Sequence, residues 1–503
     1  MSIPLNKLLI KLCILYIFSL LLSNPINYNL ELLSVVEYQN DNNNYGTSDV
    51  WGYTDEFGNE YAIVGYRYGT SILDVSTNPS EPIEIANILG PSNGDYYYHR
   101  DYKTYGDYLY IVNEMTGPDV GMQVVDLSPL PFNPPTQLDT YTNVQQSHNL
   151  WIDDSGFAFI EHHSGDNIHI ANINSPNNPV YAGSFNNLAQ NCHDIYTRNN
   201  IAYISEGWSY QFGIYDISNL NNIISLGTIT PLNGGYAHNV WLNDSGSHLI
   251  TTEETVGKTV KVWNISDLNN ITLSGQYLGE NNLAHNVHVK NDLVFISHYS
   301  VGIKIIDIFN PEDPIEIAAY DTYPQNNSSE YVGCWGAYPF TNNNMIYASD
   351  MQNGLYIFNF YPIYAGWVEG YLYSYSDNII SNASFKSLLN EKEFQVDENG
   401  FFHFGFAEGT QTFDVYSENQ LLGTVQIEID PREISTINIY VGDEMILGDL
   451  NQDGVLNILD VIMMVNIIID PNAEELMIAD MNNDESVNIQ DIILLVNEII
   501  NRN

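Results

Sequence analysis

Basic residues are scarce in this chain of 503 residues. It contains 14 lysines and arginines against 62 aspartates and glutamates, which gives a formal net charge of -48. Such a surface repels phosphate backbones and anionic lipid headgroups, so we expect no binding to nucleic acid. Metal cations and cationic or neutral ligands remain open as partners.

Cysteine is also rare, with three residues in the whole chain. Cys13 lies in a segment that we expect to be removed, which leaves Cys192 and Cys334. Both stand at equivalent positions of different repeats, where another repeat carries Ala237. We therefore expect two small buried thiols instead of a disulfide.

Long apolar runs are missing after the first residues. The run LCILYIFSLLL at residues 12–22 follows Lys7 and Lys11 and precedes the small Ser23. This order is typical of a signal peptide, here residues 1–25, and predicts a secreted or cell-surface protein. No later segment approaches 18 consecutive apolar residues, so we expect no transmembrane span in the mature chain.

One sequence pattern recurs seven times between Asp49 and Phe360. Each copy has a polar strand that often opens on His-Asn or His-Asp, an aromatic-rich strand, a strand that ends on Asp or Asn, and a turn with proline. Strand periodicity with a period of about 45 to 50 residues indicates a β-propeller with one four-stranded blade per repeat. The sequence thus predicts a mainly β protein with a seven-bladed propeller over residues 26–365. Because the last copy lacks an outer strand, we expect residues 29–38 to complete that blade.

The pattern changes after the propeller. Residues 366–442 contain alternating strands without the repeat, which predicts a small β-sandwich that acts as a spacer. Residues 445–503 contain two acidic loops, and each leads into an apolar helix. We expect this end to form a small helical module.

The two loops have the spacing of oxygen ligands for Ca²⁺. The first supplies Asp449, Asn451, Asp453, the Val455 carbonyl, Asn457 and Asp460, and the second supplies Asp480, Asn482, Asp484, the Ser486 carbonyl, Asn488 and Asp491. Gly454 permits the sharp turn in the first loop, whereas Glu485 stands at that place in the second. We expect two calcium sites, the second weaker or strained.

Paired loops closed by Asp resemble a type I dockerin over about 55 residues. The resemblance implies folding on Ca²⁺, a cohesin module as partner and a place in assemblies that degrade polysaccharides. The two residues before each closing Asp, which help to select the cohesin in many dockerins, are Ile458-Leu459 and Ile489-Gln490. Both pairs depart from the common Ser-Thr.

Histidines stand at the starts of five inner strands, and carboxylates or histidines stand at the ends of the strands that return. Because these strands are antiparallel, both sets belong to one face of the propeller and converge at the channel mouth. The candidate site consists of His99, His148, His193, His238, His285, Glu206, Glu253, His298 and Asp350. Glu114, Glu161, His162, His163 and Glu254 occupy related positions. Such groups suit a transition-metal centre or proton transfer.

Two interpretations of the histidines stay open. In one, each imidazole is a structural partner of an aspartate on a third strand, from the set Asp74, Asp126, Asp216 and Asp307. In the other, the histidines form a functional site. The first and seventh copies carry Trp-Gly instead of His, which would give the channel an aromatic side through Trp51, Tyr53, Trp335 and Tyr338. An aromatic wall opposite polar groups suits a sugar or another flat ligand, and core packing explains it equally well.

The repeats, with their ILDVS and IIDI strands, resemble LVIVD-repeat propellers. Together with SDVWGYTD, QSHNLWID, CHDIY, AHNVHVKNDLVFISHYSVGIKIIDI and CWGAYPF, they resemble the secreted choice-of-anchor B family. That resemblance implies a propeller with an interchangeable carboxy-terminal attachment module, and it names no activity.

Three functional hypotheses follow. The first is a secreted, calcium-binding, attached propeller whose channel mouth binds a small molecule or glycan. The second is a metal-dependent enzyme, a hydrolase or oxidoreductase, with a metal ion held by several of His148, His193, His238 and His285 and with Glu206 or Glu253 as general base. The third is an accessory protein of polysaccharide catabolism.

Overall fold

The computed structural model describes residues 27–38, 46–91, 99–115, 117, 119–161, 168–279, 283–325, 328–442, 447–451, 455–469, 477–482, 484 and 486–502. The expected signal peptide, His162, His163, Asp453 and Glu485 lie outside these residues. The chain divides into two compact units, Met1–Ala365 and Gly366–Asn503.

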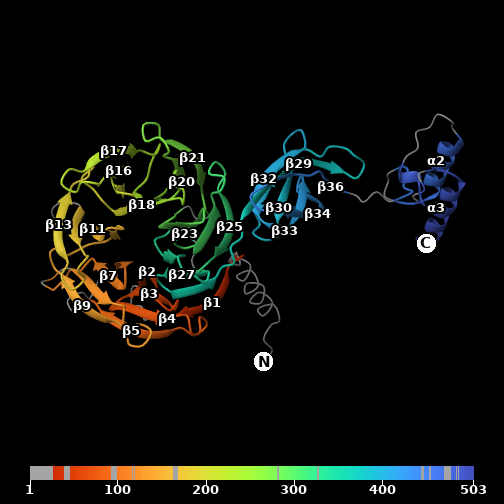
Figure 1. Ribbon diagram of the computed structural model, residues 1–503. Coiled ribbons are helices and arrows are strands. Elements are labelled where there is room, and N and C mark those ends of the chain that lie inside the picture. Colours follow the sequence, from red (N-terminus) through yellow and green to blue (C-terminus); the bar gives the residue numbers. More distant parts are fainter. Residues whose placement is uncertain are drawn as a thin grey trace, which may run out of the picture. The chain divides into compact units, whose positions relative to one another are not determined.

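Within its described residues, the first unit consists of seven four-stranded antiparallel sheets. Their first strands contact one another in a closed cycle, so the sheets form a ring with these strands innermost, as Figure 1 shows. This ring of repeated four-stranded sheets has the architecture of a β-propeller.

The strands occupy four positions from the axis outward. The first strands are β2 Thr47–Thr54, β6 Arg100–Tyr105, β10 Leu150–Ile152, β14 Asp194–Arg198, β18 Ala237–Leu242, β22 Val287–Lys290 and β26 Cys334–Tyr338. The second strands are β3 Glu60–Tyr66, β7 Tyr108–Asn113, β11 Phe157–Glu161, β15 Ile201–Ser205, β19 His248–Glu253, β23 Leu293–Ser297 and β27 Met345–Asp350.

The outer half of each sheet follows the same order. The third strands are β4 Gly69–Asp74, β8 Met122–Asp126, β12 Ile168–Asn172, β16 Phe212–Asp216, β20 Val260–Asn264, β24 Ile303–Asp307 and β28 Gly354–Asn359. The fourth strands are β5 Ile83–Leu89, β9 Thr136–Tyr141, β13 Val180–Phe185, β17 Ile224–Ile229, β21 Thr272–Tyr277, β25 Ile315–Tyr320 and β1 Glu31–Val36.

The outer strand β1 comes from the amino-terminal end of the unit. It pairs antiparallel with β28, from Glu31 opposite Asn359 to Val36 opposite Leu355. The sheet that contains β26, β27 and β28 thereby gains a fourth strand, and the edge of β28 is covered.

The aspartates on the third strands terminate those strands. Asp74, Asp126, Asp216 and Asp307 each accept a hydrogen bond from the backbone amide two residues later, at 2.8 to 2.9 Å. Such bonds start a turn directly after the strand. These carboxylates therefore shape the turns, and the imidazoles at the axis have other partners.

Trp-Gly in the first and last repeats has a packing cause. A Cβ on Gly52 of β2 would collide with the Tyr338 ring, and one on Gly336 of β26 would collide with Asp49. Glycine therefore lets the two neighbouring sheets approach each other where the ring closes.

Cys192 and Cys334 are free and buried, as expected. No helix in the described part of the chain is long and apolar enough to cross a membrane.

The second unit begins with two small sheets, β32-β29-β35 with β36 also paired to β29, and β31-β30-β33-β34. Their strands are β29 Ala365–Ser374, β30 Ala383–Ser387, β31 Glu393–Gln395, β32 Phe401–Ala407, β33 Gly409–Ser417, β34 Gln420–Ile429, β35 Ile434–Thr436 and β36 Ile439–Val441. β35 and β36 run parallel to β29. Phenylalanines from β30, β32 and β33 pack together in a buried core.

The carboxy-terminal part contains α2 Ile458–Ile469, the 3-10 helix η2 Met477–Ala479 and α3 Ile489–Arg502. Leu450, Leu456, Met464, Ile478 and Leu495 form its buried core. The two apolar helices thus bury one face each against the loops and against each other.

Candidate functional site

The first strands place their opening residues around the axis of the ring. His285 and Asn286 lie opposite a single residue of β23, because the His285 amide bonds to the Ser297 carbonyl and the Ser297 amide bonds to the Asn286 carbonyl. This irregular pairing turns two consecutive side chains toward one cavity. β18 has a register shift at the equivalent place, between Ala237 and Asn239.

As a result the axis is lined by three layers of side chains. The upper layer, which we call the His ring, consists of His99, His148, His193, His238, His285 and Trp335. The middle layer consists of Asp49, Asp101, Asn149, Asp194, Asn239 and Asn286. The lower layer includes Lys103, Trp51, Trp151, Tyr196, Trp241 and His288.

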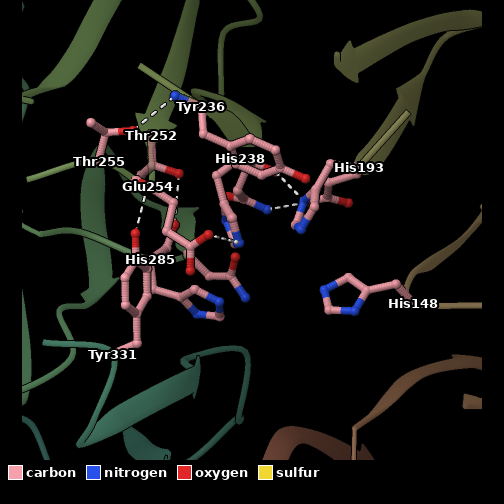
Figure 2. Close-up of polar contacts among 12 residues, drawn as sticks. His148, His193, Tyr236, His238, Thr252, Glu254, Thr255, His285 and Tyr331 are labelled. Atoms are coloured by element: carbon pink, nitrogen blue, oxygen red, sulfur yellow. Dashed lines mark hydrogen bonds and ion pairs between the residues drawn. The ribbon is translucent and has the colours of Figure 1, made fainter. Parts of the chain in front are cut away.

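The His ring is a closed circuit of aromatic groups. The centroids of neighbouring rings are 4.2 to 5.7 Å apart, from His99 through the other four imidazoles to Trp335 and back to His99. Figure 2 shows four of these imidazoles around a common space, with Glu254 beside His238. The structure therefore brings together the five imidazoles predicted at the starts of the first strands.

Backbone carbonyls fix the orientation of two imidazoles. His193 Nδ1 lies 2.9 Å from the His238 carbonyl oxygen, and His285 Nδ1 lies 2.5 Å from that of Trp335. A neutral imidazole that donates from Nδ1 presents the lone pair of Nε2 on its other side. His193 and His285 are therefore held in the tautomer that suits a metal ligand or a hydrogen-bond acceptor.

The imidazoles have two different charge states. Burial lowers the pKa of His193 and His238 well below the usual range and lowers that of His285 to about 3. Burial also disfavours charge on His148, but its hydrogen bond to Glu114 and the charge of Glu114 together raise its pKa to about 9. Near neutral pH the ring thus contains one imidazolium, at His148.

Two carboxylates complete small clusters on opposite parts of the ring. Glu114 contacts His148 and lies 3.3 Å from His99, and Glu254 lies 3.8 Å from Nε2 of His238 and close to His285. In each cluster, one potential ligand atom per residue lies within 4.8 Å of the others. Two imidazoles and a carboxylate are a common ligand set for divalent transition metals.

Next to the His ring lies a cavity of about 410 Å³, which we call the mouth pocket. Its lining combines imidazoles, aromatic side chains and one carboxylate. The residues are His99, His148, His193, Trp208, Tyr236, Glu254, Tyr299, Tyr331, Trp335 and Met351.

The middle layer is acidic and buried. Burial and then the charge of Asp101 raise the pKa of Asp49, and burial raises that of Asp194 to about 7. The Lys103 ammonium lies 2.9 Å from Asp101 and 4.5 Å from the centroid of the Trp51 ring. Lys103 and the aromatic side chains around it thus form the floor of the channel.

The four other predicted residues do not join the His ring. Glu206 accepts hydrogen bonds from Asn187, Gln211 and Tyr215, and Glu253 forms a buried ion pair with Lys261. His298 packs against Gly279 in the interior. Asp350 accepts hydrogen bonds from Thr322 and from the amides of Gln352 and Asn353.

Glu206 and Glu253, the two predicted candidates for a general base, thus lie away from the His ring, and Glu254 lies beside it. Glu253 is the last residue of β19, and its side chain points to Lys261 on β20. Glu254 follows the strand and reaches His238. Because alternate side chains of a strand point to opposite faces, a shift of one residue decides which carboxylate reaches the channel.

Several residues of the mouth pocket were missed by sequence reasoning. Trp208, Tyr299 and Tyr331 lie in loops outside the strand pattern. Tyr236 directly precedes AHNVW, but one copy of a motif gives no periodic signal. Two of the residues predicted for an aromatic side of the channel lie elsewhere. Trp51 lies in the lower layer beside His288, and Tyr53 packs on Tyr61.

The carboxy-terminal loops share one geometry. The side chain of the closing Asp460 accepts hydrogen bonds from the amides of Leu450 and Asn457, and Asp491 accepts them from Met481 and Asn488. Both closing carboxylates are fully buried. Each loop is thus wrapped around its closing aspartate, as the spacing of calcium ligands requires. Asp453 lies outside the described residues.

Residues 447–500 match the family of the dockerin type I domain. No curated protein matches the chain. Among solved structures, a chain of the mitotic checkpoint complex is similar at 11% identity and a TM-score of 0.47, over 67% of this chain and 93% of that chain. The WD40 repeats of RRP9 are similar at 10% identity and a TM-score of 0.48, over 66% of this chain and all of that chain. The propeller architecture follows from the strand pairing itself, and the carboxy-terminal end of the chain carries a dockerin type I domain.

Proposed function

We propose that this protein is a secreted, seven-bladed propeller that is attached through its dockerin domain and binds a small molecule or glycan in the mouth pocket. The observation that carries the proposal is the closed His ring beside a cavity of about 410 Å³. Ligand pockets of this size with a few convergent polar groups are typical of small-molecule sites. The resemblance of the repeats to the choice-of-anchor B family stays a prediction.

A binding screen tests the pocket. The full chain, with Ca²⁺ present, is titrated with soluble oligosaccharides and small metabolites by calorimetry, and hits are repeated with His193→Ala. We expect at least one ligand whose affinity falls about tenfold or more in this variant, because His193 lines the pocket. A ligand that binds His193→Ala as tightly as the original chain would place its site elsewhere and contradict the proposal.

Attachment rests on the dockerin domain. Ile458, Leu459, Ile489 and Ile493 on α2 and α3 are all more than half exposed. Apolar side chains in such positions favour contact with another protein. We propose that Ca²⁺ orders both loops and that these helices bind a cohesin, which would place the propeller in an assembly that degrades polysaccharides.

Pull-down with immobilised cohesins, in Ca²⁺ and in chelator, tests this attachment. We expect capture in Ca²⁺ that is lost in chelator. Double replacement of Ile458 and Ile489 by Asp should abolish capture and leave the fold intact, because both side chains are exposed. Failure of a broad cohesin set to capture the chain in Ca²⁺ would argue against a cohesin partner.

A second candidate function, a metal-dependent enzyme, is favoured by the cluster of His238, Glu254 and His285. His285 has its Nδ1 bonded to a carbonyl, which is the usual support of a metal-bound imidazole. Elemental analysis of the full chain tests it. Stoichiometric transition metal that is lost on His238→Ala with His285→Ala would support the enzyme, and a folded protein that binds only Ca²⁺ would exclude it.

A further inference from the structure

The mouth pocket is lined by one carboxylate, Glu254, and by one imidazolium, His148, which is already in contact with Glu114. We propose that this pocket binds an organic cation with a substituted ammonium group, for which Glu254 supplies the counter-charge. The inference rests on the proposed function, since it assigns a ligand class to the same pocket.

Aromatic rings form the walls of the pocket. Trp208 and Tyr236 are in edge contact, with ring centroids 4.8 Å apart, and Tyr299 and Tyr331 are in edge contact at 5.4 Å. Trp335, a member of the His ring, lines the pocket and contacts Tyr299. Rings that surround a space from several sides attract alkylated ammonium groups through their negative faces, whereas a sugar needs several polar partners as well.

Glu254 is positioned to meet such a cation. The Tyr299 hydroxyl donates to its carboxylate, and the Tyr331 hydroxyl lies 3.5 Å from its backbone carbonyl. The nearest imidazole, His238, is neutral because burial lowers its pKa. Burial raises the pKa of Glu254 to about 6, opposed by the Tyr299 hydrogen bond and the charge of His148, so the carboxylate is ionised above that pH.

Glu114, on the other side of the ring, provides the contrast. It contacts the imidazolium of His148, so this pair is internally neutral. Glu254 is the one carboxylate in the described lining of the pocket, so an added cation would meet it there. Burial and then the charge of Glu254 raise the pKa of Tyr236.

Basic side chains lie near the pocket but outside its lining: Arg100 lines the cavity below the His ring, and Lys258 lies close to Gly235. None of the residues that line the mouth pocket in the described part of the chain is a lysine or arginine. The propeller residues outside the described ranges, between residues 39 and 327, also include no lysine or arginine. With a formal net charge of -48, the chain as a whole attracts cations.

Choline and its neutral isostere 3,3-dimethylbutan-1-ol test the charge directly, because they have nearly the same shape. Each is titrated calorimetrically into the full chain in Ca²⁺, after elemental analysis has shown that transition metal is absent. We expect choline to bind at least about tenfold more tightly than the isostere, as a charged contact in a partly buried site predicts. Equal affinities, or no binding of either compound, would overturn the inference.

Two substitutions test whether the preference for choline depends on Glu254. Glu254→Gln keeps the shape and removes the charge, so we expect choline affinity to fall about tenfold while that of the isostere stays the same. Glu312→Gln is the matched control, since Glu312 lies exposed in the turn before β25 and should change neither value. Loss of choline binding in both variants, or in neither, would contradict the role of Glu254.

Substitution of Trp208 provides a second test of the proposed ligand, and this test does not depend on a buried residue. Its side chain is 69% exposed, so replacement should not unfold the protein. We expect Trp208→Ala to weaken choline binding about threefold or more and Trp208→Phe to retain most of it, because phenylalanine keeps an aromatic face. If neutral oligosaccharides bind in the screen above and choline does not, the pocket remains a ligand site and only the cation is excluded.

Discussion

At the scale of single residues, the His ring shows how surroundings give one residue type two charge states. His148 shares a carboxylate with His99 and is held as an imidazolium, whereas His193 and His285 face backbone carbonyls and stay neutral. The difference lies in the second strands, where Glu114 follows β7. One glutamate thus decides where the positive charge of the ring sits.

This charge state predicts a pH dependence. Because the pKa of His148 is raised from 6.5 to about 9 in the folded chain, the stability that it contributes is complete below pH 6.5 and is lost as the pH rises through about 9. Imidazole ¹⁵N resonances should show His148 titrating near pH 9. In Glu114→Gln, His148 remains buried but loses the carboxylate that favours its charged form, so the pKa of His148 should fall below 6.5. A wild-type His148 that titrates near 6.5 would contradict the assigned contact.

The sequence predicted that the imidazoles converge, but it did not predict which carboxylates lie beside them. The histidines open periodic strands, so their convergence follows from the repeat. The partners of Glu206 and Glu253, such as Tyr215 and Lys261, lie on neighbouring strands whose side-chain direction a shift of one residue reverses. Glu254 therefore could not be chosen over Glu253 before the register was known.

At the scale of elements, the repeat pattern predicts four-stranded sheets, and the strand pairing confirms them. Strand periodicity and proline turns repeat often enough to mark each sheet. The sequence contains no comparable periodic pattern that would predict how neighbouring sheets pack against each other. Trp-Gly in β2 and β26 is compatible with a ligand wall or with close packing, and the space around Gly52 and Gly336 shows the packing reason.

Gly52→Ala should therefore destabilise the propeller. The added methyl group would meet the buried Tyr338 ring, and we expect a loss of about 1–3 kcal/mol in the free energy of unfolding. Gly183→Ala in β13 is the matched control, because no atom lies within 4 Å of its Cβ position. Urea unfolding of both variants is the measurement. Equal stability of the two would show that the sheets adjust to the methyl group without strain.

At the scale of the whole molecule, the propeller and the calcium module depend on different forces. The propeller buries a hydrophobic core in every sheet, whereas the module buries four aspartates, Asp449, Asp460, Asp480 and Asp491, with a small apolar core. Buried carboxylates are costly unless hydrogen bonds or a cation balance their charge. We therefore expect metal binding and folding to be coupled in the module.

Chelation of Ca²⁺ should consequently unfold only part of the chain. We expect the helical circular dichroism of α2 and α3 to disappear in excess chelator and to return with Ca²⁺, while the thermal transition of the propeller stays unchanged. Asp460→Ala should lower the calcium affinity in the same assay, with exposed Glu312→Gln as control. Helical signal that is independent of Ca²⁺ would argue against coupled folding.

The pairing of β1 with β28 has a consequence for the time at which the protein can fold. Glu31 and Asn359 lie at opposite ends of the propeller sequence. At ~5–20 residues per second, a ribosome makes β1 tens of seconds before its partner strand exists. During this interval the ring cannot close, and an unpaired strand is available for wrong partners. A chaperone that holds β1 until synthesis reaches β28 would therefore raise the yield of folded protein more than one that acts on the finished chain.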